Sequence, residues 1–197
     1  MKYYTAKGDA GTTRLLGSEE RTRLSKADEI FDVLGGVDEL NSFVGFSRAV
    51  AERSSFEGSK RAQFIEALQS LQEGLFILQA ELGGGSKRLS KHNVAHLEHM
   101  IARFADEFPP IHSFVIPGAT ELSALLDVSR AVARRVERRY VRSVTLRGFD
   151  GAITTAYLNR VSSLLYVLAR YVNHVHHVPE SAPSYHSILS LRNDTER

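Results

Sequence analysis

The chain has 197 residues, 43% of them hydrophobic, which is enough to form one domain with a complete core. Its formal net charge is only +2, so no overall field attracts nucleic acid or a membrane surface, and any anion site must be local. The absence of cysteine excludes disulfides, thiolate metal sites and thiol catalysis, and no apolar run approaches the roughly 20 residues of a membrane span. We therefore expect a cytoplasmic protein that has neither nucleic acid nor a membrane as a partner.

Residues 1–25 show no helical periodicity and contain a dense cluster of glycine and hydroxyl residues between Thr5 and Thr13. Gly8 and Gly11 allow backbone conformations that other residues avoid, and such a loop can present several N–H groups to an anion. The lysine that follows the second glycine of a Walker A loop is missing. On its own, the cluster is therefore compatible with a phosphate-binding loop and with an ordinary surface turn.

Apolar residues at three- and four-residue steps predict helices over residues 27–53, 61–82 and 91–108. Gly35 and Gly36 interrupt the first pattern, and each costs roughly 1 kcal/mol relative to alanine inside a helix. A close approach to another backbone or to a ligand would explain their presence. The run Gly83–Gly85 ends the second helix.

His92, His96 and His99 share one face of the third predicted helix, at a spacing that can bind a metal. Carboxylates that would orient such ligands are not evident nearby, and exposed histidines are common. We therefore predict no metal site in the protein itself, with metal binding by these histidines as the weaker alternative.

An extended connection through Pro109 and Pro110 leads to a helix that Thr120 is placed to cap, and residues 129–140 of this helix contain five arginines. The apolar stripe of the helix consists of Leu122, Leu125, Val132, Val136 and Tyr140. A second stripe consists of Arg130, Arg134, Glu137 and Arg138, which follow one another at i, i+4, i+7 and i+8. A solvated face with ion pairs and a surface that binds an anion explain this second stripe equally well.

The last helix is predicted over residues 151–174, and its buried stripe consists of Leu158, Val161, Leu165, Leu168 and Val172. Its polar stripe consists of Asn159, Ser163, Tyr166 and Arg170. Five helices with short connections predict an all-α fold, a five-helix antiparallel bundle. We expect an N-terminal segment over 1–25, the bundle over 26–178 and a flexible polar tail over 179–197.

Five stretches taken together resemble the PduO-type ATP:cob(I)alamin adenosyltransferases, and the resemblance spans residues 4 to about 174. They are Tyr4–Thr13, Val37–Ser42, Phe114–Gly118, Arg130–Arg138 and Tyr157–Arg160. The resemblance implies a ferritin-like bundle that assembles as a homotrimer, with ATP and the corrinoid bound between adjacent subunits. It also implies the reaction, in which Co(I) of cob(I)alamin attacks the 5′ carbon of ATP and expels tripolyphosphate in the presence of Mg²⁺.

The resemblance further implies roles for individual residues. The N-terminal segment would bind the ATP phosphates through Thr5, Lys7, Gly8, Asp9, Gly11, Thr12 and Thr13. Nucleotide binding would also involve Lys26, Arg134, Glu137, Arg138 and Asn159. The implied catalytic residues are Arg130, Arg134, Glu137 and Asp38, with Arg130 paired to Asp38 across the subunit interface. Phe114 would lie beneath the corrin ring, although a plain core phenylalanine is the alternative for this residue.

Three positions depart from the family pattern. Ala10 replaces a lysine of the N-terminal loop, Ala119 stands where a glycine is usual, and Ser163 stands where an acidic residue is common. These departures concern nucleotide affinity and the polar network of the last helix more than the reaction itself.

Other functional classes remain open at this point. A helical carrier of adenosylcobalamin would need the corrinoid surface but not the phosphate loop, and a nucleotide-binding regulator or hydrolase would need no corrinoid. A nucleic-acid module is disfavoured by the near-neutral charge. The resemblance implies a cob(II)alamin reductase and an adenosylcobalamin-dependent enzyme as candidate protein partners.

Overall fold

The structure is a computed structural model that describes residues 2–18, 22–55, 58–147 and 151–185. Its elements are β1 (Thr12–Thr13), β2 (Leu24–Ser25), α1 (Glu29–Arg53), α2 (Gly58–Leu82), α3 (Lys91–Ala105), α4 (Glu121–Arg147) and α5 (Ala152–Val175). The predicted all-α class is correct for the domain, and the five predicted helices are all present. The antiparallel β1–β2 ribbon was not predicted, because strands of two residues are too short to show an alternating pattern.

The helix ends follow the local signals in the sequence. The N–H of Ile30 donates to the Asp28 carboxylate at 3.0 Å, which caps α1. The N–H of Ser123 donates to Oγ1 of Thr120 at 3.1 Å, so Thr120 caps α4 as predicted. Glycines after Leu82 end α2 as predicted, whereas α3 ends at Ala105, before the predicted end at residue 108.

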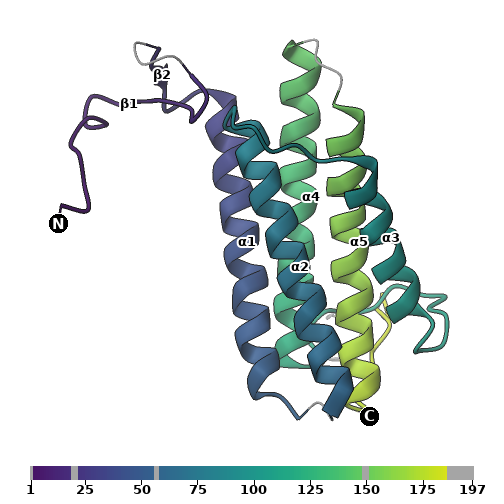
Figure 1. The fold of residues 1–197 in the computed structure, drawn as a ribbon. Coiled ribbons are helices and arrows are strands. Elements are labelled where there is room, and N and C mark those ends of the chain that lie inside the picture. Colours follow the sequence, from purple (N-terminus) through teal and green to yellow (C-terminus); the bar gives the residue numbers. More distant parts are fainter. Residues whose placement is uncertain (1, 19–21, 56–57, 148–150, 186–197) are drawn as a thin grey trace, which may run out of the picture.

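Consecutive helices run in alternating directions, as the prediction of an antiparallel bundle requires (Figure 1). In space, α1 lies between α2 and α4, and α5 lies between α4 and α3. Because an odd number of alternating helices closes the ring, one neighbouring pair must run in the same direction. That pair is α3 and α5, and for it the antiparallel prediction was wrong.

The core is formed by the apolar stripes of all five helices. Every predicted core position of α5 is buried: Leu158, Val161, Leu165, Leu168 and Val172. Burying each such side chain contributes about 1.5–3 kcal/mol. On α4 four of the five predicted core positions are buried: Leu122, Val132, Val136 and Tyr140. The fifth, Leu125, is only partly buried, and its neighbour Leu126 is buried instead. No helix among the described residues combines the length and apolar character needed to cross a membrane.

Gly36 explains part of the interrupted pattern in α1. A β-carbon at Gly36 would lie 2.9 Å from Cγ2 of Val136, so this glycine permits the close packing of α1 against α4. The close approach at Gly36 is thus to a side chain of α4, whereas the prediction was of a backbone or a ligand. A β-carbon at Gly35 would meet nothing within 4 Å.

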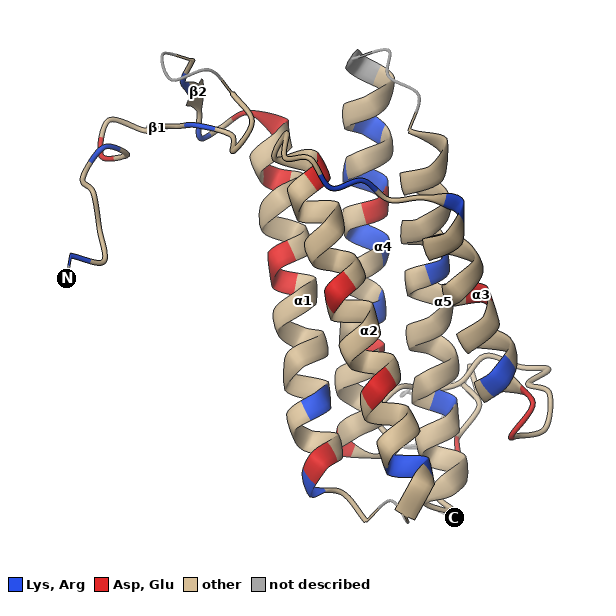
Figure 2. Ribbon diagram, viewed as in Figure 1, with Lys and Arg blue, Asp and Glu red and all other residues tan. Residues whose placement is uncertain are grey.

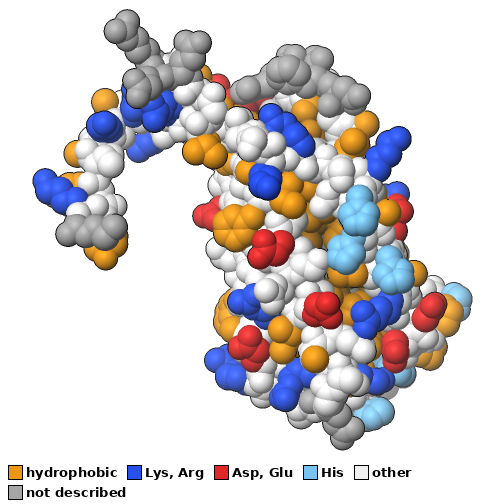
Figure 3. Space-filling view, in the orientation of Figure 1, with side chains coloured by type: hydrophobic (Ala, Val, Ile, Leu, Met, Phe, Trp, Pro, Cys, Tyr) orange, Lys and Arg blue, Asp and Glu red, His pale blue; other side chains and the backbone are white. Residues whose placement is uncertain are grey.

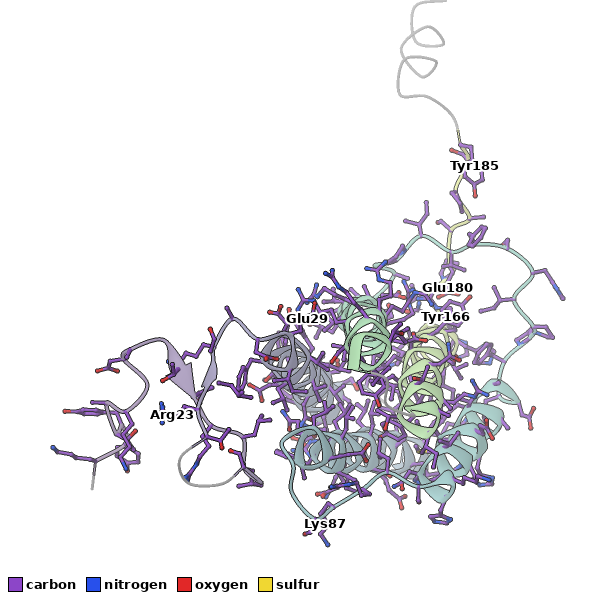
Figure 4. The ribbon with its side chains drawn as sticks, turned by 90° about the horizontal axis from the view of Figure 1, so that it is seen from above. Arg23, Glu29, Lys87, Tyr166, Glu180 and Tyr185 are labelled. Atoms are coloured by element: carbon purple, nitrogen blue, oxygen red, sulfur yellow. The ribbon has the colours of Figure 1, made fainter. Side chains whose placement is uncertain are left out.

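The N-terminal segment projects away from the bundle (Figures 1 and 4). Its ribbon packs against none of the described helices. The segment is fixed to the bundle beside the end of α2, where the N–H of Gly17 donates to the carbonyl oxygen of Gly83 at 2.9 Å. A β-carbon at Gly17 would lie 1.9 Å from the carbonyl oxygen of Gly84, so only glycine fits this junction. The candidate phosphate loop is thus held at a distance from the arginines of its own α4.

Candidate functional site

Arginine residues recur along α4 (Figure 2). Several of them have partners: Arg130 pairs with Asp127 at 3.2 Å, Arg135 pairs with Glu39, and Arg139 donates to the carbonyl oxygen of Asp32 at 3.3 Å. Arg134 and Arg138 are exposed and have no acidic partner among the residues that the structure describes. If the stripe were only a solvated face with ion pairs, each arginine would be expected to have an acidic partner. The stripe therefore has cationic groups available for an anion.

Arg130 and Arg134 line the same pocket, which lies between α4 and α5 and has a volume of about 260 Å³. The other lining residues are Ser162, Ser163, Tyr166 and Val167. Guanidinium groups can bind phosphate or carboxylate oxygens in a bidentate manner, and the serine hydroxyls add hydrogen-bonding groups to the opposite wall. The structure thus brings together two predicted catalytic arginines and the position of one departure, Ser163.

Glu137 and Asn159 meet next along the same two helices. The Asn159 side-chain amide donates to Oε1 of Glu137 at 3.2 Å, and Arg160 donates to Oδ1 of Asn159 at 2.7 Å. The hydroxyl of Ser163 donates to the Asn159 carbonyl oxygen at 3.2 Å, so it bonds within its own helix. The polar stripes that periodicity predicted on α4 and α5 therefore face each other, and they hold Glu137 in a fixed orientation.

The N-terminal loop is closed by Arg23, a residue that the sequence analysis missed. One guanidinium nitrogen of Arg23 donates to the carbonyl oxygens of Lys7 at 2.6 Å and Thr12 at 2.7 Å, and Nε donates to Oγ1 of Thr12 at 2.9 Å. The N–H of Lys26 donates to the Gly11 carbonyl oxygen at 2.9 Å. Gly11 has φ +73°, a conformation that favours glycine. Arg23 lies in an irregular segment, so no periodic signal pointed to it.

The other predicted loop residues lie in this same segment. Thr5, Lys7 and Asp9 are exposed, and Gly8, Thr12 and Thr13 are partly buried. A β-carbon at Gly8 would lie 3.1 Å from Nζ of Lys26, so the lysine head sits directly against the loop. The structure therefore gathers these residues around one loop, away from the arginines of the same chain.

Asp38 is not brought to Arg130 within the chain. Asp38 is exposed on α1 and accepts a hydrogen bond from Nε2 of Gln79 at 3.5 Å, while Arg130 binds Asp127. The nearest counterpart within one chain is the ion pair between Glu39 and Arg135. The pairing of Asp38 with Arg130 was expected between subunits, and it stays a prediction.

Phe114 is 80% exposed, in the connection between α3 and α4. The alternative of a plain core phenylalanine was wrong. Ile116 in the same connection is 50% exposed, so the segment presents apolar side chains to the surface. Such residues on a loop are typical of a binding surface rather than of packing.

Histidine side chains gather on the surface over α2 and α3 (Figure 3). A hydrogen bond of 2.8 Å joins Nε2 of His96 to the hydroxyl of Ser70. Within the described ranges, no group of three or more histidine, cysteine or acidic side chains is arranged to hold a metal ion. The histidine spacing is therefore not matched by a metal-binding arrangement in this part of the chain.

The sequence of the chain is similar to those of a known protein family. The model of the cobalamin adenosyltransferase family matches residues 3–172. A corrinoid adenosyltransferase of Citrobacter freundii is 35% identical over 179 residues, covering 86% of this chain and 93% of its own length. A corrinoid adenosyltransferase of Bacillus subtilis is 33% identical over 177 residues, covering 88% and 87%. The longer PduO protein of Citrobacter freundii is 34% identical, and the match covers 51% of its length.

Solved structures agree with this assignment. One is a phenylalanine-to-alanine variant of a PduO-type ATP:corrinoid adenosyltransferase from Lactobacillus reuteri, complexed with cobalamin and ATP. It has a TM-score of 0.80 at 28% identity, covering 93% of this chain and 99% of that chain. An arginine-to-lysine variant from the same organism, complexed with ATP, has a TM-score of 0.76 at 28% identity and covers 91% and 99%. The chain therefore belongs to the cobalamin adenosyltransferase family.

Proposed function

We propose that the protein transfers the 5′-deoxyadenosyl group of ATP to Co(I) of cob(I)alamin, giving adenosylcobalamin and tripolyphosphate. The electron pair of Co(I) forms the new bond to the 5′ carbon as the carbon–oxygen bond of ATP breaks, and tripolyphosphate leaves with that bond's electrons. The observation that carries this proposal is the pocket in which Arg130 and Arg134 converge, on a chain of this family.

Because the corrinoid is the nucleophile, the protein does not need a general base. It needs to hold two substrates in line and to stabilise negative charge on the departing phosphates. Arg134 and Arg138 are exposed cations suited to those phosphates, and Arg130 is oriented by Asp127. We assign phosphate binding to this face of α4.

Mg²⁺ in such a reaction would sit on the phosphates and neutralise part of their charge. Magnesium sites of this kind take one or two carboxylates together with substrate phosphate oxygens and water. Glu137 is the carboxylate of the arginine face and is held there by Asn159. The residues present therefore fit a phosphate-bound Mg²⁺, with Glu137 as the protein group beside it.

We infer that the site is completed by a second copy of the chain, in a homotrimer. The loop of residues 5–13 projects from its own bundle and does not pack against α4, so an adjacent subunit would supply the loop to each arginine face. In this arrangement residues 1–25 act as the nucleotide segment and residues 26–178 as the bundle. The cross-subunit pair of Asp38 and Arg130 belongs to the same proposal.

Phe114 is proposed to contact the corrinoid. An apolar ring at the lower face of cobalt would exclude water and the dimethylbenzimidazole base, leaving four-coordinate Co(II), which is easier to reduce. The exposure of Phe114 supports this assignment, since the ring is available to a ligand and contributes little to the core. Tyr166, on the wall of the arginine pocket, offers a second aromatic group between the two helices.

The proposed function is tested by anaerobic incubation of the protein with ATP, Mg²⁺ and chemically reduced cobalamin. We expect a light-sensitive alkylcobalt product in the visible spectrum, together with tripolyphosphate in equal amount. Binding of adenosylcobalamin without its formation would instead indicate a carrier. Release of phosphate from ATP without corrinoid would indicate a hydrolase, and either result would refute the transferase.

A further inference from the structure

Arg170 belongs to the predicted polar stripe of α5, yet it is buried. Its guanidinium lies 2.5 Å from Oδ2 of Asp127 on α4 and 2.9 Å from Oε1 of Glu180, which follows α5 in the chain. The guanidinium carbon lies 5.2 Å from the centre of the Tyr166 ring. Tyr166 and Glu180 are on the same side of the bundle (Figure 4). One buried cation is thus shared by two carboxylates and an aromatic ring.

Asp127 connects this cation to the candidate site. The second oxygen of the same carboxylate, Oδ1, lies 3.2 Å from Nε of Arg130. Asp127 is 5% exposed, so the carboxylate has little freedom to turn away from either arginine. The orientation of Arg130 at the pocket therefore depends on the Asp127 carboxylate, and this carboxylate is itself held in place by its ion pair with Arg170.

Glu180 connects the same cation to the segment that carries Phe114. Besides its ion pair with Arg170, Glu180 accepts a hydrogen bond from the Asn173 side-chain amide at 2.6 Å, which fixes the chain just beyond α5. The next residue, Ser181, accepts a hydrogen bond at 2.8 Å from the backbone N–H of Ile116. The hydroxyl of Thr120 donates to Oδ1 of Asn173 at 3.0 Å. The connection between α3 and α4 is thus tied to Glu180 and its neighbours on both sides of Gly118.

We propose that Arg170 is a positioning residue that fixes both halves of the site at once, Arg130 through Asp127 and the Phe114 segment through Glu180. This inference rests on the proposed function, because it assigns one half to ATP and the other to the corrinoid. The first residues of the expected flexible tail therefore have a defined role: they hold the corrinoid segment against the bundle.

The positioning role of Arg170 is best tested by substituting its two carboxylate partners. Removing the arginine would leave two carboxylates without their cation in a buried place, and such variants are strongly destabilised whatever their function. Replacing either carboxylate by its amide removes one charge, keeps the shape and leaves Arg170 with its other partner. Asp127→Asn and Glu180→Gln are therefore the informative variants. Glu107→Gln is the matched control, because Glu107 lies between α3 and α4 but pairs only with exposed Lys60 among the described residues.

We expect the two variants to affect different substrates. Asp127→Asn should lower kcat, with the Kd for cob(II)alamin unchanged, since Arg130 loses its fixed orientation. Glu180→Gln should raise the Kd for cob(II)alamin roughly tenfold, with the Kd for ATP unchanged, because the ion pair with Arg170 is lost and the hydrogen bond from Asn173 no longer has a charged acceptor. Calorimetric titration with each ligand alone, combined with steady-state kinetics, separates these effects. Equal changes in both affinities, or a lower Tm as the sole change in both variants, would overturn the proposal.

A second measurement does not depend on the reaction. Hydrogen exchange of the Ile116 amide should become faster in Glu180→Gln and stay unchanged in Glu107→Gln, because only the first variant loosens Ser181. Unchanged exchange in Glu180→Gln would overturn the coupling even if the enzyme is an adenosyltransferase. Faster exchange in a protein that forms no adenosylcobalamin would instead show that the proposed function is wrong while the connection between the segments is correct.

Discussion

The hydroxyl of Tyr157 on α5 occupies the space beside the backbone of Gly74 on α2. A β-carbon at Gly74 would lie 1.9 Å from that hydroxyl oxygen, far inside van der Waals contact. Tyr157 is 2% exposed, and burial raises the pKa of its phenol, which therefore stays protonated. The pair sets how closely α2 and α5 approach each other across the bundle.

Gly74→Ala should therefore destabilise the fold by about 1–3 kcal/mol, the usual cost of overpacking a well-filled core. Urea unfolding measures the change. Gly35→Ala is the control, because nothing lies within 4 Å of its β-carbon, and there we expect a gain of roughly 1 kcal/mol from helix propensity. Adding Tyr157→Phe to Gly74→Ala should restore part of the lost stability. Equal unfolding free energies for the two alanine variants would contradict this account of Gly74.

Helical periodicity predicted the fold well because it reports which side chains are buried, and burial dominates helix packing. All five core positions predicted on α5 are buried for this reason. The same reasoning placed Arg170 on the polar face but could not show that this arginine is buried. Its two carboxylate partners come from α4 and from the segment after α5, so their convergence depends on the tertiary fold.

Some residues of the candidate site could be predicted from the sequence, and others could not. Periodicity predicted the two polar stripes that contain Glu137 and Asn159, and the structure adds that these two side chains meet. Arg23 and Asp127 were missed, because one lies in an irregular segment and the other is a single acidic residue on a mostly apolar turn of α4. A single charged residue with tertiary partners leaves no periodic pattern in the sequence. Its partners can therefore be identified only from the three-dimensional structure.

Arg134→Lys should lower the rate of adenosylation by roughly 10- to 100-fold, the effect of losing a charged hydrogen bond to the phosphates. Lysine keeps the charge but cannot bind two oxygens in the planar manner of a guanidinium. Thermal unfolding should change little, because Arg134 is exposed. Arg139→Lys on the same helix is the control, since Arg139 contacts the Asp32 backbone and not the pocket. Wild-type activity in Arg134→Lys would remove this residue from the site.

Phe114→Ala should leave ATP binding intact while the protein fails to form four-coordinate Co(II) cobalamin. Because the ring is 80% exposed, Tm should be nearly unchanged. Phe104→Ala provides the contrast, since Phe104 is 3% exposed and its truncation should cost about 3–5 kcal/mol of stability. The visible and electron paramagnetic resonance spectra of bound Co(II) report the coordination number. An unchanged spectrum in Phe114→Ala would count against a role for this ring at cobalt.

Arg23→Gln should raise the KM for ATP more than it lowers kcat, because the loop of residues 7–12 would lose the three hydrogen bonds that close it. We expect an increase of about tenfold, in line with charged hydrogen bonds to backbone and hydroxyl oxygens. Arg14→Gln changes the same charge in the same segment and should leave KM near the wild-type value. A KM that rises equally in both variants would point to general electrostatic attraction instead of loop order.

The projecting N-terminal segment has a consequence for mixed assemblies. If each loop serves a neighbour's arginine face, a chain damaged only in its loop and a chain damaged only in its arginines carry intact, complementary halves. Co-refolding Arg23→Gln with Arg134→Lys should then regenerate some catalytic centres in which both halves are wild type. Other centres in the same mixture would carry both substitutions. Two chains that each complete their own site could not rescue one another in this way.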